Sequence, residues 1–292
     1  MFAPATREQV RLRLLLTGVS GSGKTWTALE IARSLGQNIG VIDTENGSAS
    51  RYVGQFQFQT CPLGNSMSVG VSPLEYVKAM NAATQAGFDV LIIDSLSHYW
   101  LWALDLVGGF GDWKKVRPPE RQLINAMLNL PCHLIATARS KAEYVVVDAP
   151  NRRGKLTSQP QRVGTAPLLG QDLDYEFDVV GVMDTEHVLT VEKSRCPNLG
   201  GQRIPFPGQA FAQELLSWTQ TGAPATESYE QKCNRIRVAR EAVGKTSDDV
   251  VSLMRQQFQV ESPHQLTSAQ CDQLIEQIVP ASVQLQPVPA VA

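Results

Sequence analysis

The chain has 292 residues, of which 43% are hydrophobic and 18% are charged, and this composition excludes a wholly disordered protein. Its 26 basic and 28 acidic residues give a net charge of −2, which excludes a polycation such as a histone but is compatible with a local basic patch. We expect a cytoplasmic protein, because we find no secretory signal, no apolar run approaching the roughly 18 residues of a membrane span and no cysteine pair with CxxC spacing.

The first two thirds of the chain alternates strand-like and helix-like segments. A strand over 11–17 leads through a glycine-rich turn into a helix over 24–35, which Gly36 ends. The alternation then continues through a strand at 39–43, a helix at 73–86, a strand at 88–94, a helix at 119–130 and a strand at 132–138. Strands separated by helices predict an α/β fold with a mostly parallel central sheet flanked by helices.

Beyond residue 140 the pattern changes to hairpins and then to helices. We predict one hairpin from strands at 144–147 and 155–158, a second from strands at 177–183 and 187–193, and a helix at 210–219. From 227 on, three helical segments follow, and Thr267 to Gln270 form a capping-box pattern. The predicted organisation is an α/β core (1–220), a linker (221–226), a small helical domain (227–279) and a disordered tail (280–292).

The turn after the first strand carries a phosphate-binding motif. Residues 18–25, GVSGSGKT, fit the pattern GxxxxGK[ST] in full, between a strand and a helix as the motif requires. Glycines let backbone N–H groups surround phosphates, Lys24 reaches the β- and γ-phosphates of ATP, and the Thr25 hydroxyl ligates Mg²⁺. The predicted nucleotide-binding residues are Gly18, Ser20, Gly21, Ser22, Gly23, Lys24, Thr25 and Trp26.

Two acidic residues at strand ends complete the predicted site. Asp94 ends the hydrophobic strand at 88–94, which places its carboxylate beside the phosphate loop, where it holds Mg²⁺ through water. Glu45 follows the strand at 39–43 and is a candidate base that polarises the attacking water. From spacing alone, a residue that only caps a turn is an equally good interpretation of Glu45.

The order of these motifs resembles the RecA/RadA recombinase core, and more closely the short RecA-like ATPases of bacteriophages and prophages, which are linked to recombination and single-strand annealing. The resemblance covers roughly residues 10 to 218 and rests on the phosphate loop and on the segments DTENGSAS (43–50), DSLSH (94–98), ATARSK (136–141), YEFD (175–178) and KSR (193–195). It implies a RecA-like P-loop NTPase fold, in which Glu45 activates the attacking water. It also implies that the protein acts in the cytoplasm of a bacterial or phage-infected cell.

The resemblance also implies roles for three further residues. Thr137 ends the strand that carries the γ-phosphate sensor in this family, although the usual sensor is often Gln. Lys193 and Arg195 match the basic residues that reach the ATP of a neighbouring subunit, which implies a homo-oligomer, either a ring or a filament.

Two stretches are candidates for binding single-stranded DNA. Residues 107–117 combine glycines with aromatic and basic side chains, the mixture that single strands require. Residues 139–165 carry six basic residues and two acidic ones, a local charge of +4. An ordinary solvated loop or hairpin is the competing interpretation of each stretch. The predicted DNA-binding residues are Trp113, Lys114, Lys115, Arg152, Arg153 and Lys155.

The sequence therefore favours a Mg²⁺-dependent ATPase that binds single-stranded DNA as an oligomer and assists homologous recombination or annealing. A second hypothesis is an ATP-dependent assembly or loading factor that recruits a replication or recombination protein through its C-terminal helices. A third, a small-molecule kinase, is disfavoured because no arginine-rich lid follows the early helices.

Overall fold

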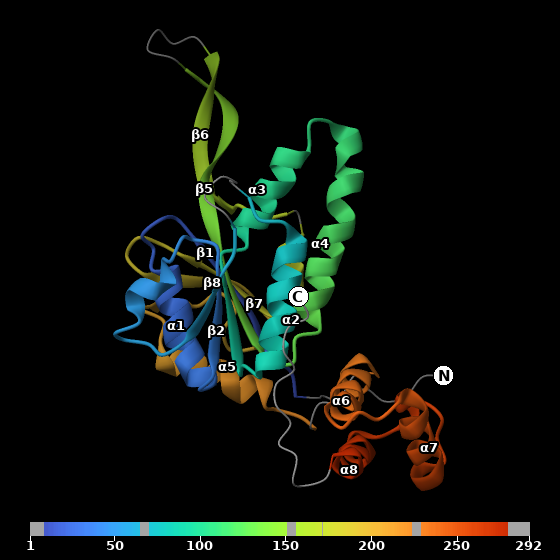
Figure 1. Ribbon diagram of the computed structural model, residues 1–292. Coiled ribbons are helices and arrows are strands. Elements are labelled where there is room, and N and C mark those ends of the chain that lie inside the picture. Colours follow the sequence, from blue (N-terminus) through green and yellow to red (C-terminus); the bar gives the residue numbers. More distant parts are fainter. Residues whose placement is uncertain (1–8, 65–69, 151–155, 171, 224–228, 280–292) are drawn as a thin grey trace. The chain divides into compact units, whose positions relative to one another are not determined.

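The computed structural model describes residues 9–64, 70–150, 156–170, 172–223 and 229–279 (Figure 1). The chain divides into two compact units, a core unit at 11–220 and a second unit that contains the residues from 221 onward. The structure differs from the predicted 1–220 core at the N-terminus, because Gln9 and Val10 group with the second unit, where the Gln9 amide donates to the Ala223 carbonyl at 2.8 Å. The predicted tail, 280–292, lies outside the described residues.

A nine-stranded sheet forms the centre of the core unit, in the order β3-β2-β4-β5-β1-β7-β8-β9, with β6 pairing β5. The pairs from β3 across to β7 are parallel, and β8 and β9 are added antiparallel. The carboxyl ends of the parallel strands therefore meet at one edge of the sheet. The strands are β1 (Arg13–Gly18), β2 (Ile39–Asp43), β3 (Gln59–Pro62), β4 (Val90–Asp94), β5 (His133–Pro150), β6 (Leu156–Pro167), β7 (Val179–Met183), β8 (Val188–Ser194) and β9 (Arg203–Pro205).

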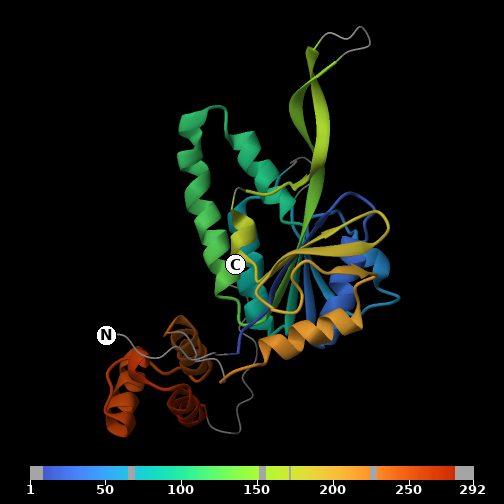
Figure 2. The same ribbon diagram turned by 180° about the vertical axis from the view of Figure 1, so that it is seen from behind.

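Helices cover both faces of this sheet (Figures 1 and 2). Alternate residues of β1 show the division, because Leu14 and Leu16 pack in one core cluster with α1 and α5, whereas Leu15 packs in the other with α2 and α4. Strands buried on both faces explain the continuous apolar runs in the sequence. The helices are α1 (Lys24–Leu35), α2 (Pro73–Ala86), α3 (Ser97–Leu106), α4 (Trp113–Leu128) and α5 (Gln209–Thr219).

The structure corrects the predicted loop at 107–117. Helix α3 precedes this stretch, and α4 begins at Trp113 rather than at Pro119, so that Pro118 and Pro119 lie inside the helix. Each proline removes a backbone N–H donor from the helix. Burial of Val116, which is 0% exposed, and stacking of Trp113 on Trp100 at 5.6 Å offset that loss.

The predicted first hairpin is present, but it is longer than the sequence indicates. Strand β5 continues without interruption from the sheet to Pro150 and pairs antiparallel with β6 from Ser140 onward. We call the paired part of β5 and β6, residues 140–150 and 156–167, the arm. The arm projects beyond the sheet at the edge where the parallel strands end (Figures 1 and 2).

The second unit contains three helices with a core of their own, α6 (Tyr229–Ala242), α7 (Ser247–Phe258) and α8 (Ser268–Ile278). The predicted capping box is present, since the Thr267 hydroxyl accepts from the Gln270 amide and the Gln270 side chain accepts from Thr267. A second capping box, between Thr246 and Asp249, begins α7. None of the helices that the structure describes is long and apolar enough to cross a membrane.

Candidate functional site

The phosphate loop, residues 18–25, joins β1 to α1 at the carboxyl edge of the sheet. A side chain at Gly18 would meet the Met183 carbonyl at 2.5 Å, and Gly23 has a φ of 87°, so both positions require glycine. The Lys24 ammonium donates to the carbonyls of Gly18 and Val19 at 3.0 and 2.9 Å. Burial lowers the pKa of Lys24, while the carboxylates of Asp94 and Glu45 oppose that effect.

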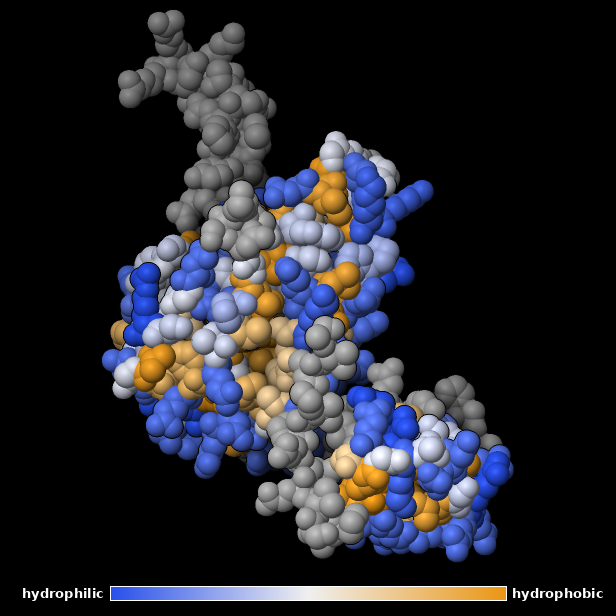
Figure 3. Space-filling view, in the orientation of Figure 1, coloured by the Kyte–Doolittle hydropathy of each residue, from blue (hydrophilic) through white to orange (hydrophobic). Residues whose placement is uncertain are grey.

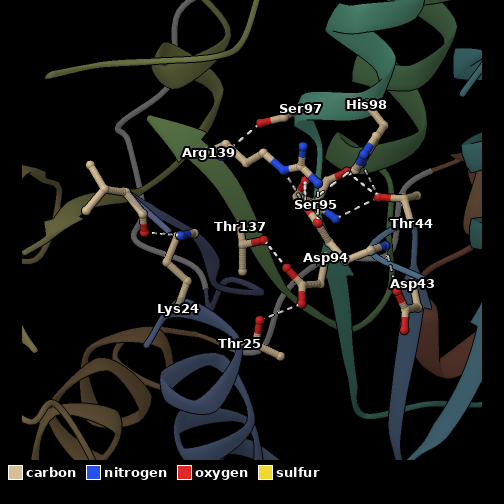
Figure 4. A network of polar contacts seen from close by, with 12 residues as sticks. Lys24, Thr25, Asp43, Thr44, Asp94, Ser95, Ser97, His98, Thr137 and Arg139 are labelled. Carbon is tan, nitrogen blue, oxygen red and sulfur yellow. Dashed lines mark hydrogen bonds and ion pairs between the residues drawn. The ribbon is translucent and has the colours of Figure 1, made fainter. Parts of the chain in front are cut away.

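Asp94 is held between two hydroxyl groups from different parts of the fold (Figure 4). Thr25, at the start of α1, donates to one carboxylate oxygen at 2.7 Å, and Thr137, on β5, donates to the other at 2.5 Å. The residue is 2% exposed, and burial raises the pKa of its carboxyl against the effect of these hydrogen bonds. Thr137 therefore contacts the Asp94 carboxylate in this structure.

Glu45 lies beside Asp94 and is held by an arginine. The Arg139 guanidinium spans the carboxylate, donating from Nε to Oε1 at 2.8 Å and from Nη2 to Oε2. The Ser95 hydroxyl donates to Oε1 at 2.8 Å, and the Glu45 amide donates to Asp43 at 2.7 Å. Burial tends to raise the pKa of Glu45, but the hydrogen bonds from Arg139 and Ser95 outweigh it, so the pKa is lowered and the group is a carboxylate.

A buried network of hydrogen bonds lies next to Glu45 and connects Thr44, Ser95 and His98. The Thr44 hydroxyl lies 2.8 Å from His98 Nδ1 and 3.0 Å from the Ser95 carbonyl, while the Ser95 amide donates to the same hydroxyl at 2.9 Å. Burial lowers the pKa of His98, whose Nδ1 is 4.0 Å from Glu45. These contacts fix the strand ends of β2 and β4 against each other (Figure 4).

The residues at this edge fit a nucleotide with Mg²⁺. The glycine cradle leaves room that side chains would fill, and the Lys24 ammonium bonds to loop carbonyls at the place where it meets phosphates in a P-loop. The Thr25 hydroxyl and the Asp94 carboxylate are oxygen groups of the kind Mg²⁺ prefers. Within the described ranges no three His, Cys, Asp or Glu side chains form a metal site by themselves.

Lys193 and Arg195 lie away from this site. Strand β8 is antiparallel to β7, and its end at Ser194 pairs with Val179, whereas the phosphate loop adjoins the other end of β7 at Met183. The Lys193 ammonium donates to the carbonyls of Asp174 and Tyr175 at 2.9 and 2.8 Å, and Arg195 pairs with Asp178 at 2.8 Å. Neither side chain belongs to the nucleotide site of its own chain.

The structure describes three of the six predicted DNA-binding residues. Trp113 is half-buried and stacks on Trp100, Lys114 is exposed, and Lys115 pairs with Asp112 at 2.8 Å. Apolar residues reach the surface in this region of α3 and α4, and apolar area also extends over other parts of the same face (Figure 3). Arg152, Arg153 and Lys155 lie outside the described residues.

Arg139 is a site residue that sequence reasoning placed elsewhere. The sequence counts it with the basic DNA-binding stretch, but its guanidinium is bound to Glu45. The signal that identifies it is strand periodicity, since Arg139 lies two residues beyond Thr137 on β5 and therefore on the same face of the strand. Trp26, also predicted for the nucleotide, is 42% exposed and packs edge-on against Tyr52 and Phe56.

A family model described as an AAA domain matches residues 11–204 of the chain. The match runs from just before β1 into β9 and so contains the phosphate loop, Glu45, Asp94, Thr137 and Arg139. Together with the sheet order it confirms the predicted α/β P-loop fold. No curated protein matches the sequence.

The Thr137 hydroxyl can be tested by two substitutions. Thr137→Val removes the hydrogen bond to a buried carboxylate, which is worth about 1.5–3 kcal/mol, so we expect kcat for ATP to fall by roughly tenfold to a hundredfold. Thr137→Ser keeps the donor and retains most of the activity. Both variants are measured by steady-state ATP turnover across a Mg²⁺ titration. Full activity of the valine variant would show that turnover does not require the hydrogen bond from Thr137 to Asp94.

The contact between Arg139 and Glu45 predicts a change in the pH profile. Arg139 lowers the pKa of Glu45, so this carboxylate, which we predict to be the base, persists to lower pH in the parent protein. In Arg139→Ala the pKa of Glu45 rises, and the acid limb of kcat moves to higher pH. The measurement is the pH profile of kcat for both proteins; an unmoved acid limb means that the titrating group is not Glu45.

Proposed function

This chain belongs to the AAA-domain family of P-loop ATPases, and we propose that it couples ATP hydrolysis to binding of single-stranded DNA, as an oligomer that assists recombination or annealing. The observation that carries the proposal is the path of β5. One strand bears Thr137 and Arg139 at the nucleotide site and then continues as one side of the arm. A force on the arm is therefore transmitted along β5 to Thr137 and Arg139, which hold Asp94 and Glu45.

The chemistry at the nucleotide follows from four side chains of the site. Lys24 neutralises phosphate charge, Thr25 and Asp94 hold Mg²⁺, and Glu45 acts as the base that orients the attacking water. Bound Mg²⁺ supplies further neutralisation of the phosphate oxygens. Glu45 is paired with Arg139 in the structure, so catalysis requires this contact to open or to share the carboxylate with water. The Arg139 contact thus supplies a point at which DNA controls turnover.

The charge of residues 139–165 supports a nucleic-acid ligand. Residues 139–165 carry six basic and two acidic residues in a chain whose net charge is −2. Lys141, two residues beyond Arg139, is exposed at the base of the arm. Basic side chains contact a phosphate backbone without regard to its sequence. The resemblance to RecA-like phage ATPases favours a single strand and a role in recombination or annealing.

An oligomer is proposed from the position of Lys193 and Arg195. They lie at the end of the sheet opposite the phosphate loop, so any action on ATP is on the ATP of a neighbouring subunit. Cationic groups at a transferring phosphoryl group stabilise the transition state. The contacts of Lys193 with Asp174 and Tyr175 hold its ammonium in place within its own chain.

The second unit favours one further candidate function. Helices α6, α7 and α8 enclose an apolar core that is separate from both clusters of the core unit. An independent module of this kind fits recruitment of another replication or recombination protein, and the chain is then an ATP-dependent loading factor. In that case turnover responds to the partner protein and not to DNA.

ATP turnover with and without single-stranded DNA tests the proposal. We expect oligonucleotides to raise kcat severalfold, because the arm and Arg139 share one strand. Lys24→Ala abolishes nucleotide binding, and Glu45→Gln retains binding but loses hydrolysis, because an amide cannot act as base. If ATP turnover of the parent is the same with and without DNA, while Glu45→Gln is inactive, the result supports the loading-factor candidate over the proposed function.

The basic stretch at 139–165 is tested by neutralising Arg152, Arg153 and Lys155 together. We expect weaker binding to single strands of any sequence and a salt dependence reduced in slope by up to about 2, for three lost phosphate contacts. The charge-matched control neutralises Arg11, Arg51 and Lys78, which are exposed and lie outside the arm. Fluorescence anisotropy with labelled oligonucleotides at several salt concentrations measures both proteins, and equal affinities in the two variants would remove Arg152, Arg153 and Lys155 from the DNA site.

Mixed assemblies test the trans role of Lys193 and Arg195. Subunits with Lys193→Ala and Arg195→Ala lack the trans charge, and Glu45→Gln subunits lack the base. If the charges act across an interface, mixing the two inactive proteins restores interfaces that contain both functions, and part of the ATP turnover returns. Co-assembly without any recovered turnover shows that the two basic residues do not act in trans.

A further inference from the structure

The turn between β7 and β8 contacts the phosphate loop on the side away from the carboxylates. His187 Nδ1 lies 3.1 Å from the Ser22 carbonyl, and a side chain at Gly23 would meet the same nitrogen at 2.9 Å. A carbonyl oxygen only accepts, so Nδ1 carries the hydrogen and donates it. The imidazole is thereby fixed to the backbone that surrounds the phosphates.

Phe206 lies beside this histidine and is exposed. Its ring centroid is 5.7 Å from that of His187, its amide donates to the His187 carbonyl at 2.9 Å, and its side chain is 73% exposed. No other large hydrophobic residue in the described part of the chain is exposed to this extent. An apolar ring held at the surface next to a phosphate loop offers a flat face to a ligand.

The direction of a bound nucleotide follows from the strand order. β1, which leads into the phosphate loop, lies between β5 and β7. Asp94 ends β4 and Glu45 follows β2, both on the β5 side, where we predict the γ-phosphate to bind. His187 and Phe206 come from the β7, β8 and β9 side. A triphosphate whose γ end meets the carboxylates therefore extends its nucleoside toward Phe206.

We propose that Phe206, backed by His187, is the stacking platform for the base of the nucleoside triphosphate. An aromatic ring stacks on any base, so the platform adds affinity for the nucleoside without contacting the phosphates. The hydrogen bond from His187 to Ser22 keeps the platform in register with the phosphate loop. The proposal requires only that the chain binds nucleotide, and it is independent of DNA binding.

Competition against a fluorescent ATP analogue, in the absence of DNA, tests this site. Phe206→Ala should weaken ATP by roughly tenfold, within the range for loss of one base–aromatic stack. Inorganic tripolyphosphate has no base, so it should compete equally well in the parent and in Phe206→Ala. Phe206→Trp keeps an aromatic ring at this position, so it should bind ATP as tightly as the parent does. The control, Tyr175→Ala, removes another exposed aromatic residue, 64% exposed and near the end of the sheet opposite the phosphate loop.

Each other outcome overturns the proposal. Unchanged ATP affinity in Phe206→Ala shows that the base lies elsewhere. An equal loss for ATP and for tripolyphosphate shows that Phe206 supports the loop rather than the base. An equal loss in Tyr175→Ala shows a general effect of removing a surface ring.

Discussion

The burial of one carboxylate, Asp94, imposes the constraint on which the site depends. A carboxylate that is 2% exposed is strongly destabilising unless its oxygens are hydrogen-bonded, and here one oxygen accepts from Thr25 and the other from Thr137. These contacts join the start of α1, the end of β4 and the middle of β5 at one point. The phosphate loop, the metal side of the site and the strand that leads into the arm therefore share one rigid frame.

Glu45 is attached to this frame by a different kind of contact. Asp94 is held by two hydroxyl groups within the sheet, whereas Glu45 is held by the long side chain of Arg139, which lies at the surface. A flexible, partly solvated ion pair exchanges partners more readily than buried hydroxyl contacts do. The fold thus combines a fixed carboxylate at Asp94 with an adjustable one at Glu45, and the adjustable contact lies on the strand that forms the arm.

The strand order also separates two chemical functions along the phosphate loop. Carboxylates and their hydrogen-bond donors gather on the β4 and β2 side, whereas an exposed aromatic ring lies on the β7 and β8 side. The two sides differ because β8 and β9 return antiparallel, which brings the turn at His187 and the residue after β9 to the edge where the parallel strands end. On our proposal, a nucleotide meets polar groups at its phosphate end and the apolar face of Phe206 at its other end.

The sequence by itself determined the α/β class, the phosphate loop, Asp94 and most helix boundaries. These features depend on local signals: α1, β2 and α2 have the predicted limits because glycine, proline and apolar periodicity act within a few residues. The tertiary structure alone decided the partners of Thr137 and Arg139, the start of α4 and the placement of Phe206. Arg139 contacts a residue 94 positions away, and α4 extends through two prolines because Val116 and Trp113 are packed against other elements. Such contacts depend on which strands become neighbours, and no local pattern in the chain encodes that order.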